Sequence, residues 1–199
     1  FFEGFTSYYD DLLLRRAELI DDQQYLDLLA KTINQVQQTP GRLVHSLASS
    51  SFEAWTKYYR MDENTPNDTV SYYTKGALVA LCLDLSLRSG SKAVPDKPSQ
   101  PTPSLDQVMR SLWARSHQNG NDGVIDEQEV LDVLQTVSGR SFAREIKAWV
   151  HGTTDLPLTQ LLATVGIETV LTKAPLAQQL GLRLEVANGS LKIKSVLAG

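Results

Sequence analysis

Apolar residues recur every three to four positions along most of the chain up to Val165, which is the spacing of one face of an α-helix. Turn-forming residues close several of these runs, as at Thr39-Pro40-Gly41 and Ser89-Gly90. The pattern predicts helices over residues 4–19 and 21–38, one or two short ones within 41–55, and further helices over 70–88, from 104 onward, and over 126–139, 142–150 and 158–165. The fold class is therefore predicted to be mainly α.

Three helix starts carry a side chain that suits capping. Asp21 or Asp22 precedes the second predicted helix, Ser104 stands three residues before Gln107, and Asp126 stands three residues before Glu129. A short polar side chain at such a position accepts a hydrogen bond from a free backbone amide of the first turn. These starts are the best-defined helix boundaries in the sequence.

The pattern changes after Gly166. Residues 182–186 and 191–196 alternate apolar and polar side chains, and Asn188-Gly189 between them favours a tight hairpin turn. Because two strands are too few for a stable sheet, we expect the chain to stop inside a second domain of β structure.

Four parts follow from these patterns: helices over 1–90, a linker over 91–103, further helices of the same domain over 104–168, and the start of a truncated β domain over 169–199. The linker holds Pro95, Pro98, Pro101 and Pro103 among small polar residues. Proline removes backbone donors, so we expect this stretch to be extended and mobile.

Composition narrows the class of protein. The net charge is −4, from 19 basic and 23 acidic residues, and no basic cluster is present, which argues against a nucleic acid partner. The most apolar run, 77–87, contains Asp84 and is too short to span a bilayer, so it is predicted to be a buried helix. Cys82 lies within it and is predicted to be a buried small hydrophobe. It excludes an intramolecular disulfide and leaves the cellular compartment open.

Two motifs carry candidate chemistry. Glu3 opens Glu-Gly-Phe-Thr-Ser-Tyr, and Tyr73 lies in Tyr-Tyr-Thr-Lys-Gly at the head of the apolar helix. Taken singly, the acid is a surface residue that complements a helix dipole, and the tyrosines are amphipathic core residues.

Taken together and in order, these motifs resemble the glycyl aminopeptidase family of the gluzincin zinc metallopeptidases, whose members end in a PDZ domain. The supporting stretches cover nearly the whole chain: 3–14 (EGFTSYYDDLLL), 40–55 (PGRLVHSLASSSFEAW), 72–88 (YYTKGALVALCLDLSLR), 105–113 (LDQVMRSLW), 137–140 (VSGR) and 152–157 (GTTDLP). The resemblance implies a multi-helical C-terminal catalytic subdomain followed by the beginning of the PDZ domain, with its first strand near Leu180-Gly181-Leu182. The rival interpretation is an unrelated hairpin packed on the helices.

The resemblance also implies roles. Glu3 matches the family's third zinc ligand, and Tyr73 matches the tyrosine that hydrogen-bonds the developing oxyanion. The other two zinc ligands are the histidines of a His-Glu-x-x-His motif, which this chain lacks: its three histidines are His45, His117 and His151. We interpret these three as surface or partly buried polar residues.

The sequence therefore predicts a piece of a zinc-dependent aminopeptidase that hydrolyses amino-terminal peptide bonds. The missing ligands and general base are expected upstream of Phe1. The chain itself begins with Phe1-Phe2-Glu3, without an initiator methionine or a visible signal peptide. We expect the longer protein of which this chain is a part to bind zinc and a peptide substrate. Any peptide binding by the PDZ domain is likewise expected only where that domain is complete. The 199 residues alone are expected to be inactive. The alternative is a non-catalytic helical scaffold or interaction module.

Residues 118–129 resemble a calcium loop in part, with Gly123 at its sixth place and Glu129 at its twelfth. Gln118 and Gly120 stand where carboxylates are expected. We therefore favour a polar turn that leads into an N-capped helix, and leave calcium binding as the alternative.

Overall fold

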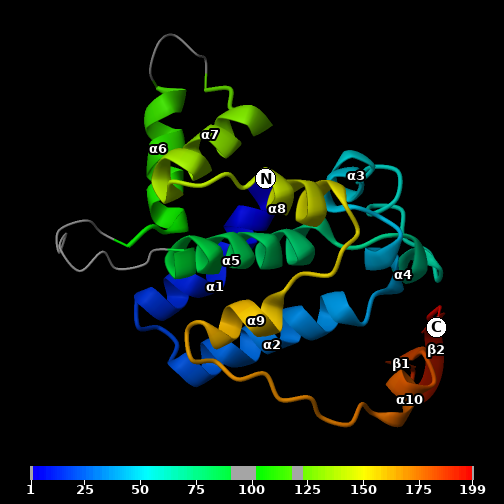
Figure 1. Cartoon of the computed structure of the whole chain (residues 1–199). Helices are drawn as coiled ribbons and strands as arrows, with labels where there is room; N and C mark the ends of the chain where they lie inside the picture. The colour runs from blue at the N-terminus through cyan, green and yellow to red at the C-terminus, as the bar shows by residue number, and fades with distance from the viewer. Residues whose placement is uncertain (1, 91–101, 118–122, 199) are drawn as a thin grey trace. The chain divides into compact units, whose positions relative to one another are not determined.

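The computed structural model describes residues 2–90, 102–117 and 123–198. The fold is mainly helical with one antiparallel hairpin near the C-terminus, which confirms the predicted fold class (Figure 1). Within the described residues, no helix combines the length and the apolar character needed to cross a membrane.

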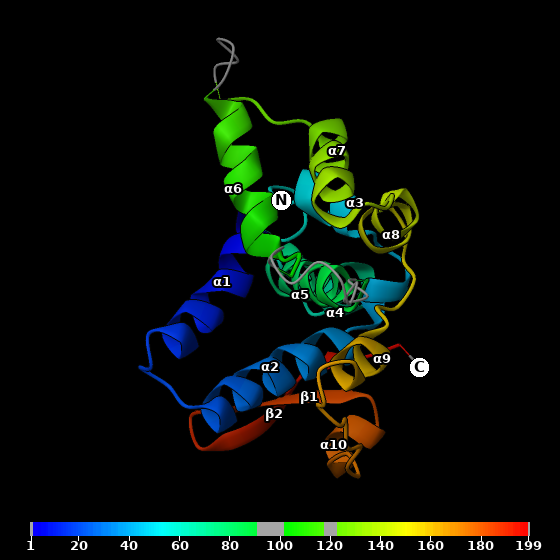
Figure 2. The ribbon, with the colours of Figure 1, turned by 60° about the vertical axis from the view of Figure 1, so that its left-hand side comes forward.

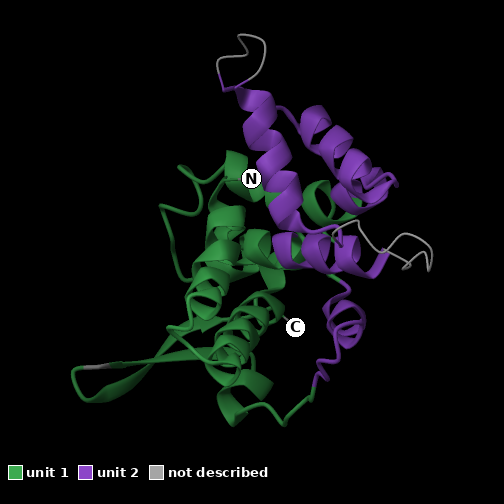
Figure 3. Ribbon diagram, turned by 90° about the vertical axis from the view of Figure 1, so that its left-hand side faces the viewer, with its two compact units in different colours: residues 1–79, 148–156, 170–199 green, residues 80–147, 157–169 purple. Residues whose placement is uncertain are grey.

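The chain divides into two compact units, shown in separate colours in Figure 3. The first unit comprises residues 1–79, 148–156 and 170–199, and the second comprises 80–147 and 157–169. This division is by spatial contact, and the domain limits predicted from the sequence remain a prediction.

Helices of the first unit follow the predicted order. They are α1 (Phe2–Arg16), α2 (Asp22–Gln37), the 3-10 turn η1 (Pro40–Leu43), α3 (Leu47–Phe52) and the short α4 (Thr65–Asp68). Asp21 caps α2 by accepting from the Gln24 amide at 2.8 Å, while the Gln24 side chain accepts from the Asp21 amide at 2.9 Å. This reciprocal capping box is the predicted helix start.

Helix α5 (Tyr72–Gly90) is the most buried element, and its residues are shared between the two units. Its side chains are apolar on nearly every side, and Leu78, Ala80, Cys82 and Leu83 are each at most 1% exposed. A helix that is apolar all round belongs in a core, as predicted.

Asp84 is the one acid on α5, and the second unit uses it as a cap. Its Oδ1 accepts from the backbone amide of Leu105 at 2.6 Å, and its Oδ2 lies 2.8 Å from the guanidinium of Arg88. Asp84 is 5% exposed, so these bonds satisfy a charge that burial would otherwise make costly.

The second unit contains α6 (Leu105–Ser116), α7 (Glu127–Ser138), α8 (Ala143–Ile146) and α9 (Leu158–Ala163). The predicted capping boxes at Ser104 and Asp126 are present, and Gly139 ends α7 with a φ of +75°, a conformation that glycine adopts freely. The polar turn before α7 thus ends in the N-capped helix that was predicted. The first five positions of the candidate calcium loop, 118–122, lie outside the described residues.

Three details differ from the sequence-based expectation. Residues 65–68, where no helix was predicted, form α4, and residues 142–150 divide into α8 and a π-helical turn at Lys147–His151. The short α10 (Leu176–Gln179) had no predicted counterpart. Each is about one turn long, and so short an element leaves too little periodicity to recognise. The predicted linker lies outside the described residues except at 102 and 103.

Strands β1 (Leu182–Ala187) and β2 (Ser190–Val196) form the predicted antiparallel hairpin (Figure 2). Asn188 and Gly189 form its turn with φ values of 52° and 75°, the left-handed conformation that Asn-Gly provides. A side-chain pair anchors it: the Asn67 amide donates to Val196 O at 2.9 Å and accepts from the Ala198 amide at 2.8 Å.

Candidate active site

The N-terminal parts of α1 and α5 cross where two glycines meet. A Cβ atom built on Gly4 would lie 2.7 Å from the Cα of Gly76, and one built on Gly76 would lie 2.7 Å from the Cα of Gly4. Any side chain at either position would collide with backbone. Each glycine belongs to one of the two motifs, so the contact joins Glu-Gly-Phe-Thr-Ser-Tyr to Tyr-Tyr-Thr-Lys-Gly.

This crossing positions both predicted site residues. Glu3 precedes Gly4 in the first turn of α1, where a carboxylate suits the helix dipole, and its side chain is exposed. Tyr73 lies about one turn before Gly76 on α5 and is half-buried. The negative charge of Glu3 contributes to raising the pKa of Tyr73, so the carboxylate lies within electrostatic reach of the hydroxyl.

Tyr73 belongs to a cluster of aromatic rings that the sequence did not reveal. The hydroxyl of Tyr59 lies 3.1 Å from that of Tyr73 and 3.1 Å from that of Tyr72. Tyr58 packs beside them, with its ring centroid 5.3 Å from that of Tyr72 and 5.9 Å from that of Tyr73. Trp55 extends the cluster toward solvent, 5.1 Å from the ring of Tyr59. The signal in the sequence was an aromatic-rich stretch over 55–59, but no spacing related it to Tyr73.

Burial and hydrogen bonding separate the acidities of the three hydroxyls. Hydrogen bonds from Tyr72 and Tyr73 lower the pKa of Tyr59, because they stabilise its phenolate. The pKa of Tyr72 is raised, chiefly by burial. The pKa of Tyr73 is raised, first by its hydrogen bond to Tyr59 and in smaller part by burial and by Glu3. Tyr73 therefore keeps its proton at neutral pH and is able to donate it in a hydrogen bond.

Two other motifs meet through an ion pair. Arg42, from Pro-Gly-Arg, donates to both carboxylate oxygens of Asp155, from Gly-Thr-Thr-Asp-Leu-Pro, at 2.8 and 3.3 Å. Lys75 is only 2% exposed, and its ammonium has no hydrogen-bond partner among the described residues. Burial lowers the pKa of Lys75, and the charge of Asp155 opposes that shift. The motif lysine is thus buried, within electrostatic reach of an acid that Arg42 already pairs.

One histidine departs from its predicted setting. His45 is 7% exposed, whereas a surface or partly buried position was expected. It is buried because its Nδ1 pairs with the Thr69 hydroxyl at 2.7 Å and Gly41, four residues earlier, lies against the backbone of Thr69. His117 and His151 are exposed, as predicted.

Cys82 is fully buried, and burial raises the pKa of its thiol to about 12. A thiol is nucleophilic only when ionised, so Cys82 is inert in the folded chain. The prediction of a buried small hydrophobe is confirmed.

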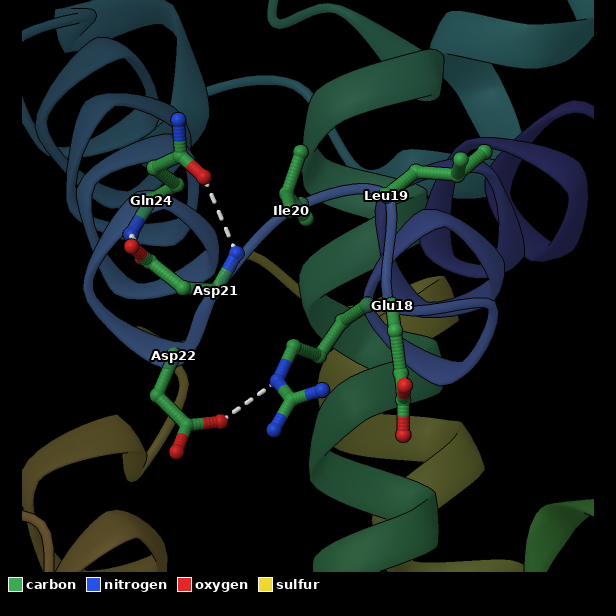
Figure 4. Close-up of a pocket in the computed structure, with 7 residues that line it drawn as sticks. Glu18, Leu19, Ile20, Asp21, Asp22 and Gln24 are labelled. Carbon is green, nitrogen blue, oxygen red and sulfur yellow. Dashed lines mark hydrogen bonds and ion pairs between the residues drawn. The ribbon is translucent and has the colours of Figure 1, made fainter.

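No group of three or more His, Cys, Asp or Glu side chains with metal-binding geometry occurs within residues 2–90, 102–117 and 123–198. A surface hollow lies at the turn between α1 and α2, where Arg15 pairs with Asp22 (Figure 4). Its lining comprises Arg15, Glu18, Leu19, Ile20, Asp21, Asp22 and Gln24. Neither Glu3 nor Tyr73 lines this hollow.

The motifs agree with the comparisons to known proteins. Residues 1–79 match the M61 glycyl aminopeptidase family, which is the family that the motifs predicted. A solved structure of an aminopeptidase N family protein from Idiomarina loihiensis is 32% identical and superposes with a TM-score of 0.81, over 98% of this chain and 34% of that one. This chain therefore spans about a third of the length of that protein. No curated protein matches the chain.

Proposed function

We propose that this chain is part of a zinc-dependent aminopeptidase that hydrolyses amino-terminal peptide bonds. The observation that carries the proposal is the crossing of α1 and α5 at Gly4 and Gly76, which brings a carboxylate and a protonated phenol within electrostatic reach of each other. The family match over residues 1–79 includes both side chains. The activity is a property of the longer protein, because this chain spans only 34% of its solved relative.

Tyr73 supplies transition-state stabilisation in this proposal. Attack on the scissile carbonyl places negative charge on its oxygen, and a preorganised phenolic O–H stabilises that oxyanion by donating a hydrogen bond. Because the pKa of Tyr73 is raised, the donor stays protonated at neutral pH. Because the ring is half-buried among other tyrosines, it loses little freedom when the substrate binds.

Glu3 is proposed as one zinc ligand. A catalytic zinc takes three protein ligands and keeps a fourth position open. The described residues do not meet that requirement by themselves, since Glu3 is their single candidate for the family's ligand set. The two histidine ligands and the general base are proposed to come from a segment outside these 199 residues, which alone would be inactive.

The hairpin is proposed to begin a PDZ-like domain that, when complete, binds peptides. Val186, Leu191 and Ile193 are 77%, 67% and 60% exposed, so apolar residues on its strands lack a covering layer. A two-stranded sheet is only marginally stable, and further strands would cover these residues.

The test is a single-hydroxyl substitution in the longer protein. Tyr73→Phe should lower kcat by about 10²–10³ and leave KM nearly unchanged, because the donor acts on the transition state and the ring is kept. Tyr58→Phe is the matched control: its ring lies in the same cluster, and among the described residues its hydroxyl accepts a 3.4 Å bond from Ser71 and is not bonded to Tyr73.

Equal and small changes in kcat for both variants would mean that Tyr73 only packs in the core. That result would favour the alternative of a non-catalytic helical scaffold. The 199-residue chain gives a separate check, with amino-acyl amides as substrates. Chelator-sensitive turnover by that chain would contradict its proposed inactivity.

A further inference from the structure

Tyr59 occupies a turn that fixes its position although the residue is 52% exposed. Its backbone amide donates to the carbonyl of Ala54 at 2.9 Å, and Ala54 is itself buried. Its ring packs edge-on against Tyr58 at 5.5 Å. Contacts within residues 54–59 thus hold the Tyr59 phenol. Its hydroxyl lies beside the hydroxyls of Tyr72 and Tyr73, the two tyrosines at the start of α5.

The protons of the three hydroxyls limit how they pair. Tyr72 is 8% exposed, and a buried hydroxyl that donates to nothing is costly, so its proton goes to the oxygen of Tyr59 at 3.1 Å. Tyr59 has one proton, and its remaining neighbour in the cluster is the oxygen of Tyr73, also at 3.1 Å. Once Tyr73 accepts that bond, its own proton is left for another acceptor.

We propose that Tyr59 is a positioning residue for Tyr73: it accepts from Tyr72, donates to Tyr73, and so directs the Tyr73 proton toward the substrate oxyanion. This inference rests on the function proposed above for Tyr73. Hydrogen bonds in a chain polarise one another, so each donation strengthens the next, and Tyr73 becomes a better donor than a lone phenol. The same contacts restrain the torsion of its hydroxyl before the substrate arrives.

The pKa shifts of Tyr59 and Tyr73 describe the ionised cluster, in which the Tyr59 phenolate accepts from both neighbours and Tyr73 donates to it. Below the pKa of Tyr59, its hydroxyl keeps a proton that only one neighbour can receive. The rival interpretation is that Tyr59 only packs, through its contacts with Trp55 and Tyr58. Tyr59→Phe separates the two, because it keeps the ring and removes the hydroxyl.

The kinetic test uses the longer protein and a double-mutant cycle. Tyr59→Phe should lower kcat by about three- to tenfold with little change in KM, the effect of one neutral hydrogen bond. In a Tyr73→Phe background, the same substitution should lower kcat no further, because its effect passes through Tyr73. Tyr58→Phe should leave kcat unchanged.

Three results would overturn the inference: an unchanged kcat for Tyr59→Phe, equal losses for Tyr58→Phe and Tyr59→Phe, or losses that multiply in the double variant. Only the inference fails if Tyr73→Phe is slow and Tyr59→Phe is not. If Tyr73→Phe is itself as fast as the wild type, the proposed function fails as well.

A second readout needs no activity. With Cζ-labelled tyrosine in the 199-residue chain, the Tyr73 carbon resonance reports hydrogen bonding at its oxygen. It should move in Tyr59→Phe and stay in place in Tyr58→Phe. Should Tyr59→Phe fail to fold, Tyr72→Phe weakens the same chain of bonds one step earlier and should move the resonance less, in the same direction. A stationary Tyr73 resonance in the folded variant would contradict the arrangement.

Discussion

At the scale of single residues, the chain buries polar groups beside its motifs and satisfies most of them locally. His45 shares Thr69 with Ser50, whose hydroxyl donates to the carbonyl of Val70, so this small network joins α3 to the segment that leads into α5. The Nε2 atom of His45 makes no hydrogen bond in the described part of the chain and lies 3.5 Å from a carboxylate oxygen of Glu53. The imidazole is thus placed where a positive charge is poorly solvated.

His45 should make stability depend on pH. Its pKa is lowered, first by burial and then by the charge of Lys57, while Glu53 opposes the shift and Lys75 adds to it. A histidine whose pKa is lower in the folded state binds its proton more readily when unfolded. Its contribution is therefore fully present above its unfolded pKa of about 6.5 and is lost as the pH falls toward the folded pKa.

His45→Gln keeps a side chain able to bond Thr69 and does not titrate. Urea unfolding should show a larger fall in the midpoint between about pH 7.5 and about pH 5.5 for the wild type than for this variant. Parallel declines for the two proteins would mean that other groups account for the acid sensitivity.

At the scale of elements, the sequence determined most where the interaction is local. The capping boxes at Asp21 and Asp126, and the turn at Asn188-Gly189, each need only residues a few positions apart, and all were predicted. The one-turn helix α4 was not, because four residues carry too little periodicity. Nor was the cap that Asp84 provides for Leu105, because it joins two distant segments.

The crossing of α1 and α5 should tolerate no side chain. In Gly76→Ala, the new Cβ would lie 2.7 Å from the Cα of Gly4, so the helices must separate, at a cost of roughly 1–3 kcal/mol. Gly90→Ala is a matched control on the same helix, where the nearest atom is Nε of Arg140 at 4.0 Å. There alanine should be neutral or stabilising by up to about 1 kcal/mol.

Denaturant titration of both variants measures the difference in the free energy of unfolding. If Gly76→Ala unfolded at the same midpoint as Gly90→Ala, the close approach of the two helices would not exist in solution, and the placement of Glu3 beside Tyr73 would lose its support.

At the scale of the whole molecule, the ordered set of motifs predicted the family, and the structure brings motifs together in pairs. Gly4 meets Gly76, and Arg42 pairs with Asp155 across 113 positions of sequence. The candidate site was only partly predictable. Glu3 and Tyr73 were assigned from motifs, whereas Tyr59 comes from a turn with no periodic relation to either and reaches Tyr73 only through the fold.

The attachment of the hairpin to the rest of the first unit is testable. Its strands leave apolar side chains exposed, so polar contacts hold it: Asn67 bonds Val196 and Ala198, and Arg183 donates to the Thr39 hydroxyl at 2.8 Å. Asn67→Ala deletes two of these bonds at once. Because a lone hairpin is marginally stable, its end should then open more often.

Hydrogen exchange at the Leu197 amide measures that opening, since this amide donates to the carbonyl of Gly181 at 2.7 Å and keeps that acceptor in the variant. Exchange should be about three- to tenfold faster in Asn67→Ala, the effect of losing a bond worth about 1 kcal/mol. Asn64→Ala is the matched control, because Asn64 accepts from the same Asn67 amide at 2.9 Å but makes no bond to the hairpin. Equal exchange rates in the two variants would mean that Asn67 does not hold the hairpin. Faster exchange in Asn67→Ala alone would mean that its side chain fixes the hairpin to the helices.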